Sequence, residues 1–200
     1  QVKNEPYAVA PMGYEFEQLI LYITTLNLGT CWLGGTFDRA ALSKTLGDSA
    51  DLYIPAISPI GYFEHKTLRE SIVRGLVRAD SRKPWETIFF DGDFQTPLSQ
   101  QAAGAYAKPL ELLRLGPSAS NKQPWRVVRK GGNYHFYEEQ TPGYSSAFPF
   151  DMQAIDMGIA ACHFQLAATE LGLGGRIDLA AAPELALPAN TIYKFSWIAG

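Results

Sequence analysis

Hydroxyl and amide side chains are concentrated in one short stretch of the chain, Gly116–Trp125 (GPSASNKQPW). Pro117 and Pro124 fix the backbone φ angle and remove two N–H donors, so the stretch is stiff at both ends. The polar side chains that it presents are those of Ser118, Ser120 and Asn121. Such groups either satisfy backbone groups in a capped turn between a helix and a strand, or hydrogen-bond a polar, planar ligand at the end of the helix.

Composition narrows the class of protein. The chain has 200 residues, of which 46% are hydrophobic and 18% charged, as in an ordinary soluble globular protein of one domain or two small ones. Its net charge of −3 argues against a nucleic-acid or membrane-surface partner, because phosphate binding needs a basic surface. The apolar run Leu19–Gly35 contains threonines, an asparagine and glycines, so we expect a buried helix that runs into a loop.

The two cysteines indicate the cellular compartment. Cys31 and Cys162 are far apart and form no CxxC pair, so neither a disulfide framework nor a structural zinc site is expected, and a cytoplasmic location fits. We expect Cys31 to be a buried small hydrophobe. The three histidines lack metal-ligand spacing, so no metal site is predicted.

Two segments of the chain resemble each other. Tyr14–Gly29 and Met157–Gly172 are both apolar at helical spacing nearly all round, and both end in Leu-Gly, which is typical of a glycine-capped helix. An apolar extended run follows each of them, Leu52–Tyr62 and Thr191–Ile198. The repetition predicts an internally duplicated α+β chain, folded as an internal pseudo-dimer.

The predicted fold class is therefore α+β, with two fused pseudo-symmetric halves at residues 1–92 and 93–200. Each half would hold a central buried helix and an antiparallel sheet. The first central helix has only about a dozen residues before it, so we expect further residues upstream of Gln1. As an internal pseudo-dimer, the chain is expected to be a monomer or a weak homodimer.

Shorter elements are predicted between the central helices. Helices are expected over Arg39–Leu46, Leu68–Val77 and Gln100–Leu115. A β-hairpin is expected from Trp125–Lys130 and Asn133–Tyr137, which flank a Gly-Gly turn.

Four motifs carry a resemblance to a known family. Pro-Ser-x-x-Asn-x-Gln-Pro-Trp in the quoted stretch resembles the signature loop of the nitroreductases, the FMN-dependent NAD(P)H oxidoreductases. The other three, which occur in the family's order, are Leu28–Asp38, Ile54–Tyr62 and Arg82–Trp85. The family's Arg-Arg-Ser-x-Arg helix, which grips FMN, has no match here, and its place would be upstream of Gln1.

The resemblance implies a flavin site between the two halves. Leu33, Gly34 and Gly35 would offer backbone N–H donors to the N5/O4 edge of the flavin, since glycine lets the backbone approach a ring closely. Pro117, Ser118, Ala119 and Asn121 match the family positions that reach the flavin across the dimer interface. For each of these segments, an ordinary helix-end turn is the alternative.

The phosphate of FMN calls for a cation, and Arg82 and Lys83 are the candidates, with Arg78 as a helper. A solvated basic face is the alternative for these residues. Trp32 would either cover the flavin ring or line the pocket, or else belong to the core. The pair Glu15 and Glu17 would sit at a helix start, where carboxylates complement the helix dipole.

The implied reaction transfers a hydride from NAD(P)H to FMN and then passes electrons to a small-molecule oxidant such as a nitroaromatic or a quinone. No side-chain acid or base is needed, so no catalytic residue is predicted. Two alternatives keep the fold: a flavin-binding scaffold without turnover, and flavin fragmentation or reductive dehalogenation. The last is the weakest, because the chain shows no long polar lid insertion.

Overall fold

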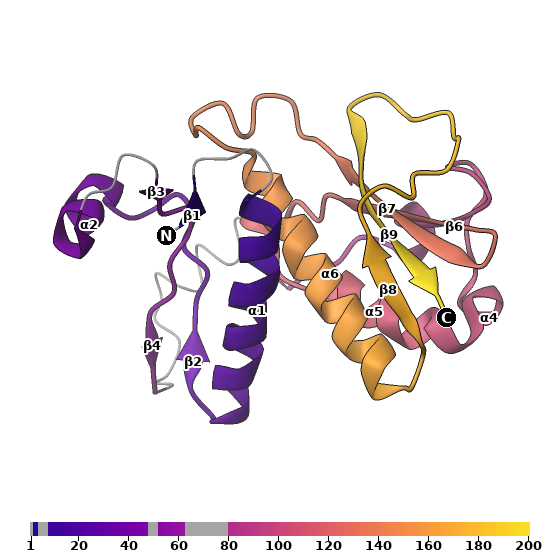
Figure 1. The fold of residues 1–200 in the computed structure, drawn as a ribbon, viewed down its shortest axis with the longest axis horizontal. Coiled ribbons are helices and arrows are strands. Elements are labelled where there is room, and N and C mark those ends of the chain that lie inside the picture. The colour runs from indigo at the N-terminus through magenta and orange to yellow at the C-terminus, as the bar shows by residue number, and fades with distance from the viewer. Residues whose placement is uncertain (1, 4–7, 48–51, 63–79) are drawn as a thin grey trace.

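Two long helices lie side by side in the middle of the molecule (Figure 1). The structure is a computed structural model, and it describes residues 2–3, 8–47, 52–62 and 80–200. Helix α1 spans Val9–Thr25 and helix α6 spans Met152–Glu170. A five-stranded sheet with its own helices packs on one side of this pair, and small N-terminal elements lie on the other side.

Helix α6 is the buried centre that its composition predicts. Fourteen of its residues are buried, and apolar side chains surround most of its circumference. It begins five residues before the predicted start, because the Asp151 carboxylate caps it by accepting from the Gln153 N–H at 3.0 Å. The predicted glycine cap is confirmed: the helix ends at Glu170, and Gly172 follows with a φ of 68°, which is suited to glycine.

Helix α1 ends earlier than predicted. The expected cap, Gly29, lies instead in the short strand β2 (Gly29–Thr30), and the left-handed position after the helix is Asn27, with a φ of 56°. Asparagine is the residue that most often replaces glycine at this position. The Leu-Gly pattern therefore located the second helix end correctly and the first one two residues too late.

Glycines allow α1 and α6 to approach until their backbones touch. A Cβ built on Gly158 would lie 2.0 Å from the Ala10 carbonyl oxygen, and one on Gly13 would lie 2.4 Å from the Ile155 carbonyl oxygen. Any larger side chain at these two positions would push the helices apart. The close crossing joins the N-terminal and C-terminal parts of the chain.

The main sheet has the strand order β5-β6-β7-β9-β8. Its strands are β5 (Phe89–Asp91), β6 (Trp125–Lys130), β7 (Asn133–Glu139), β8 (Gly175–Asp178) and β9 (Thr191–Ala199). The hairpin of β6 and β7 is confirmed, with β7 two residues longer than predicted. The sheet is mixed instead of wholly antiparallel, because β5 pairs with β6 in parallel. Helices α5 and α6 cover it, and the largest apolar core lies between them and the strands.

The helix predicted over Gln100–Leu115 is broken into three pieces. These are α4 (Gln100–Ala103), the 3-10 turn η2 (Gly104–Tyr106) and α5 (Ala107–Leu115). Gly104 breaks the helix with a φ of 57°. The break places Pro109 in the first turn of α5, where its missing N–H costs no hydrogen bond.

The described strands of the N-terminal part form two two-stranded pairs, which are smaller than the five-stranded main sheet. The described residues of this part form α2 (Arg39–Leu46), as predicted, and the two strand pairs, β1 (Val2–Lys3) with β3 (Leu52–Tyr53) and β2 with β4 (Ile60–Gly61). The helix predicted over Leu68–Val77 lies outside the described residues. The internal duplication and the division at residue 92 stay predictions. β5 and β6 pair across that division.

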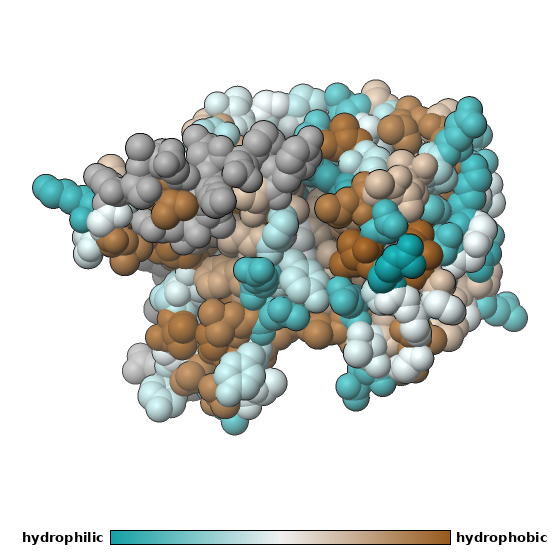
Figure 2. All heavy atoms as spheres, in the orientation of Figure 1, coloured by the Kyte–Doolittle hydropathy of each residue, from teal (hydrophilic) through white to brown (hydrophobic). Residues whose placement is uncertain are grey.

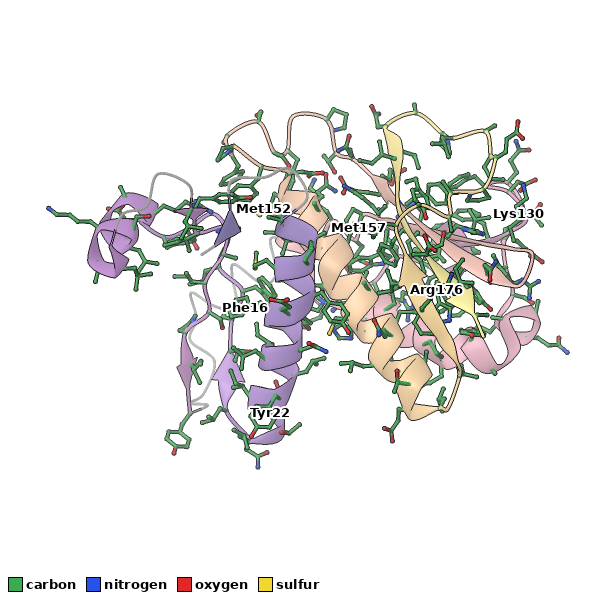
Figure 3. All side chains as sticks on the ribbon, viewed as in Figure 1. Phe16, Tyr22, Lys130, Met152, Met157 and Arg176 are labelled. Carbon is green, nitrogen blue, oxygen red and sulfur yellow. The ribbon has the colours of Figure 1, made fainter. Side chains whose placement is uncertain are left out.

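Apolar side chains are also exposed on the outside of α1 and on the β2–β4 pair. Figure 2 shows this brown area over the lower left of the molecule. Its exposed residues include Leu19, Tyr22, Leu26, Ile60 and Tyr62. Tyr22, labelled in Figure 3, projects from the last turns of α1.

Candidate functional site

The loop that contains Trp32, Leu33, Gly34 and Gly35, called the glycine loop below, lies against the start of α6. Met152, in the first turn of α6 (Figure 3), has its sulfur 3.1 Å from the position of a Cβ on Gly34. The same position on Gly35 is 3.9 Å from the ring of Phe148. The loop thus belongs to the first half of the chain and contacts the second half, as the resemblance implies.

Leu33 anchors this loop through its backbone. Its N–H donates to the Ile57 carbonyl at 2.9 Å, and the Ile57 N–H donates back to the Leu33 carbonyl at 2.9 Å. The backbone N–H group of Leu33 is therefore already used inside the protein. Within the described residues the N–H groups of Gly34 and Gly35 have no acceptor, so these two are the donors that remain for a ligand.

The signature loop is held in an unusual backbone conformation. Ser120, Asn121 and Gln123 all have positive φ angles, between 48° and 53°. The Ser118 hydroxyl accepts from the Gln123 N–H at 2.9 Å, which ties the loop across its base. Pro117 is half-buried before it. A positive φ costs conformational free energy for a residue other than glycine, and residues in this conformation are concentrated at ligand-binding sites.

The two loops meet on one apolar cluster. Its buried members are Val9, Met152, Ile155 and Ile159. Trp32, from the glycine loop, and Ala119, from the signature loop, both pack against this cluster. The structure therefore brings together segments that lie more than eighty residues apart in the sequence, at the N-terminal half of α6.

Asp156 holds the signature loop from inside the molecule. Its Oδ1 accepts from the Ala119 N–H at 2.9 Å, and within the described residues its Oδ2 has no hydrogen-bond partner. Complete burial raises the pKa of this carboxyl well above its usual range, with the nearby carboxylates of Glu138 and Asp151 acting in the same direction. The sequence analysis did not single out Asp156, and its only signal was an acid in the middle of an apolar helix.

The sequence analysis wrongly placed Glu15 and Glu17 at the start of a helix, whereas both lie beyond its first turn. Of the two, Glu17 matters for the site. It is buried inside α1, where its Oε2 accepts from the Trp32 indole N–H at 2.8 Å and its Oε1 lies 2.8 Å from Nε2 of His163. Because α1 starts at Val9 and not near Tyr14, Glu17 lies in the helix interior and not at its positive end. Its buried carboxylate instead fixes the orientation of Trp32 beside the glycine loop.

The predicted phosphate cations lie next to the signature loop and are already engaged. Arg82 donates through Nε and Nη2 to the Leu115 carbonyl, at 3.2 and 2.9 Å. Nζ of Lys83 lies 3.7 Å from a Glu139 carboxylate oxygen. Burial, followed by the nearby Arg126 charge, lowers the pKa of Lys83. Arg78, the predicted helper, lies outside the described residues.

A cavity of about 430 Å³ opens in the segment that leads from β7 into α6. Phe148, whose ring lies 3.9 Å from the position of a Cβ on Gly35, is one of its walls, and Phe150 and Asp151 line it with several hydroxyl and amide side chains. No lysine or arginine lines it among the described residues. Its volume suits a small aromatic molecule.

Three further features of the described part of the chain bear on function: possible metal-binding groups, the cysteines and possible membrane-spanning helices. It holds no group of three or more His, Cys, Asp or Glu side chains that could bind a metal ion. Cys162 is buried, whereas Cys31 is exposed and not buried as expected, because it follows a two-residue strand at the surface. No described helix is long and apolar enough to cross a membrane.

The residues present fit the ring of a flavin. Two glycines allow close backbone approach, their N–H groups have no acceptor among the described residues, and the partly buried Trp32 can face the ring. The fit to the phosphate is weaker, because Lys83 is paired with Glu139.

Comparisons with known proteins identify the family of the chain. A family model described as "Putative TM nitroreductase" matches residues 2–168. A crystal structure described as that of a "putative nitroreductase" from Thermotoga maritima superimposes with a TM-score of 0.64 at 20% sequence identity, over 99% of this chain and 68% of that one. No curated protein matches the chain. Because the family model covers most of the sequence, the chain belongs to this nitroreductase family.

Proposed function

We propose that the chain is an FMN-dependent NAD(P)H oxidoreductase that reduces nitroaromatic or quinone-like acceptors. The family and the fold support an oxidoreductase activity. The observation that carries the proposal is the meeting of the glycine loop and the signature loop on one cluster at the start of α6. When bound, FMN supplies the hydride chemistry, so the protein has to bind, orient and shield the reacting groups.

The roles of the residues follow from their contacts. Gly34 and Gly35 would donate their N–H groups to the polar edge of the ring, where negative charge increases on reduction. Ala119 and its neighbours Pro117, Ser118 and Asn121 would hold the ring from the other loop. Asp156 keeps that loop in place through the Ala119 N–H.

Arg82 and Lys83 are the two candidate cations for the phosphate, and both lie next to the signature loop. Lys83 would have to give up part of its pairing with Glu139. The donor nicotinamide and the oxidant would use the same face of the ring in turn. The cavity beside Phe148 is the place through which a neutral aromatic oxidant would reach it.

A titration of the purified protein with FMN, followed by anaerobic NADH or NADPH, tests the proposal. We expect the fluorescence of FMN to be quenched as it binds, and the absorbance near 450 nm, where oxidised flavins absorb, to bleach with either donor. Bound FMN that neither donor reduces would favour the alternative, a flavin-binding scaffold without turnover. Failure to bind FMN would overturn the proposal.

A further inference from the structure

The Arg39 guanidinium donates hydrogen bonds to three backbone carbonyls. Its Nε donates to the Ile54 carbonyl at 3.0 Å and its Nη2 to the Pro55 carbonyl at 2.9 Å. The same Nη2 also donates to the Gly34 carbonyl. The first residue of α2 therefore ties the glycine loop to the segment that leads out of β3.

Aromatic rings surround the same guanidinium. Its central carbon lies 4.5 Å from the ring centroid of Phe37, 5.1 Å from that of Phe148 and 6.0 Å from that of Phe150. Arginine stacks well on aromatic faces because its charge is planar and weakly hydrated. Phe148 and Phe150 come from the second half of the chain, so Arg39 links both halves at the glycine loop.

No carboxylate of the described residues forms a salt bridge with Arg39. Desolvation lowers the pKa of the guanidinium, which nevertheless stays charged because arginine ionises so far above neutrality. Among the described residues, carbonyl dipoles and ring faces are thus what hold this positive charge beside the glycine loop.

The contact with Gly34 fixes the direction of the next amide. The Gly34 carbonyl and the Gly35 N–H belong to one planar peptide, and in a trans peptide they point in opposite directions. Since Arg39 holds the carbonyl on one side, the Gly35 N–H points to the other side. Within the described residues that N–H has no acceptor.

We propose that Arg39 is a positioning residue for flavin reduction. It orients the Gly34–Gly35 peptide so that the Gly35 N–H donates to the polar edge of the flavin, and its charge polarises that peptide from behind. The inference rests on the proposed function of the site. Because negative charge on the ring edge grows on reduction, a protein with the Gly35 N–H oriented by Arg39 binds the reduced flavin more tightly than the oxidised one, which raises the midpoint potential of the flavin.

The test compares Arg39→Gln and Arg39→Lys with Lys44→Gln in the protein loaded with FMN. Lys44 is an exposed cation on the same helix, so its replacement removes the same charge without touching the glycine loop. Two quantities are measured for each protein: the Kd for oxidised FMN and the midpoint potential of the bound FMN by spectroelectrochemistry. Circular dichroism checks the fold, and Arg39→Lys serves if Arg39→Gln does not fold.

We expect Arg39→Gln to weaken the preference for reduced over oxidised FMN about tenfold, which lowers the midpoint potential by ~30 mV for a two-electron couple. Arg39→Lys should fall between Arg39→Gln and the unchanged protein, and Lys44→Gln should equal the unchanged protein. If FMN binds to all four proteins and has the same midpoint potential in each, the role of Arg39 is overturned and the proposed function stands. Absence of FMN binding in the unchanged protein would overturn both.

Discussion

At the scale of single residues, buried carboxylates set the geometry around the candidate site. Glu17 orients Trp32, and Asp156 holds Ala119. Neither acid faces the solvent, so each has lost its hydration and depends on the donors that the fold supplies. Their replacement by neutral isosteres therefore has consequences that can be measured in the protein without flavin.

Glu17→Gln should destabilise the protein by ~2 kcal/mol, because Oε2 accepts from the Trp32 indole N–H while Oε1 pairs with His163 Nε2, and an amide keeps only one of these two oxygens. Urea unfolding measures the loss, and the emission of Trp32 should change with it. Glu15→Gln is the control, since Glu15 is exposed on the same helix. Equal stability of the two variants would contradict the role given to Glu17.

Asp156→Asn should change how stability depends on pH. Burial holds the pKa of Asp156 well above its ordinary 3.8, so the folded protein keeps a proton that the unfolded chain releases. Asp156 therefore costs stability as pH rises above about 4, and this cost increases until the pH reaches the raised value. Asparagine does not ionise, so the variant should gain stability relative to the unchanged protein as the pH rises.

Urea unfolding of both proteins at pH 5 and pH 8 measures this difference. The free energy of unfolding of the Asp156→Asn protein, relative to that of the unchanged protein, should be higher at pH 8 than at pH 5. A stability difference that stays constant between the two values would show that Asp156 ionises equally in the folded and unfolded states.

At the scale of elements, the contact of α1 with α6 joins the parts that carry the two loops. The helices meet at Gly13 and Gly158, with no space for a side chain between their backbones. Since α1 leads into the glycine loop and α6 lies beneath the signature loop, their separation sets the distance between the loops.

Gly158→Ala should destabilise the protein by ~3 kcal/mol, because the new Cβ would lie 2.0 Å from the Ala10 carbonyl and the backbones would have to separate. Thermal unfolding measures the effect. Gly174→Ala is the matched control, since the nearest atom to its Cβ would be 3.8 Å away. If both variants unfold at the same temperature, the helices do not pack as described.

The sequence predicted those elements whose signals are local. The hairpin of β6 and β7 was confirmed because a Gly-Gly turn separates two β-rich runs, and α6 because its apolar pattern runs all round. The break at Gly104 was missed, since one glycine among alanines is a weak signal. The start of α1 was missed because the helix was predicted only from Tyr14, where the repeated segment begins, whereas it starts at Val9 with Pro11 in its first turn.

The sequence predicted less of the site. The motifs identified the two loops, but their supports come from distant segments. Glu17 pairs with His163 across 146 positions of the chain, and Asp156 reaches Ala119 from another element. Arg39 marked only the start of a helix. Such contacts depend on the packing of α1 against α6, which local pattern does not encode.

At the scale of the whole molecule, the candidate site is formed only when both parts of the chain come together. The glycine loop precedes β3, the signature loop follows α5, and both rest on the first turns of α6. A ligand that bridges the two loops would therefore stabilise the whole fold against unfolding.

Titration of the unchanged protein and of Gly35→Ala with FMN tests the central claim most directly. The nearest atom to a Cβ at Gly35 is 3.9 Å away, so the alanine fits and the melting temperature should stay the same. If the flavin lies on this backbone, the added methyl group should raise the Kd for FMN about tenfold. Equal Kd values in the two proteins, or no binding in either, would contradict a flavin site between these loops.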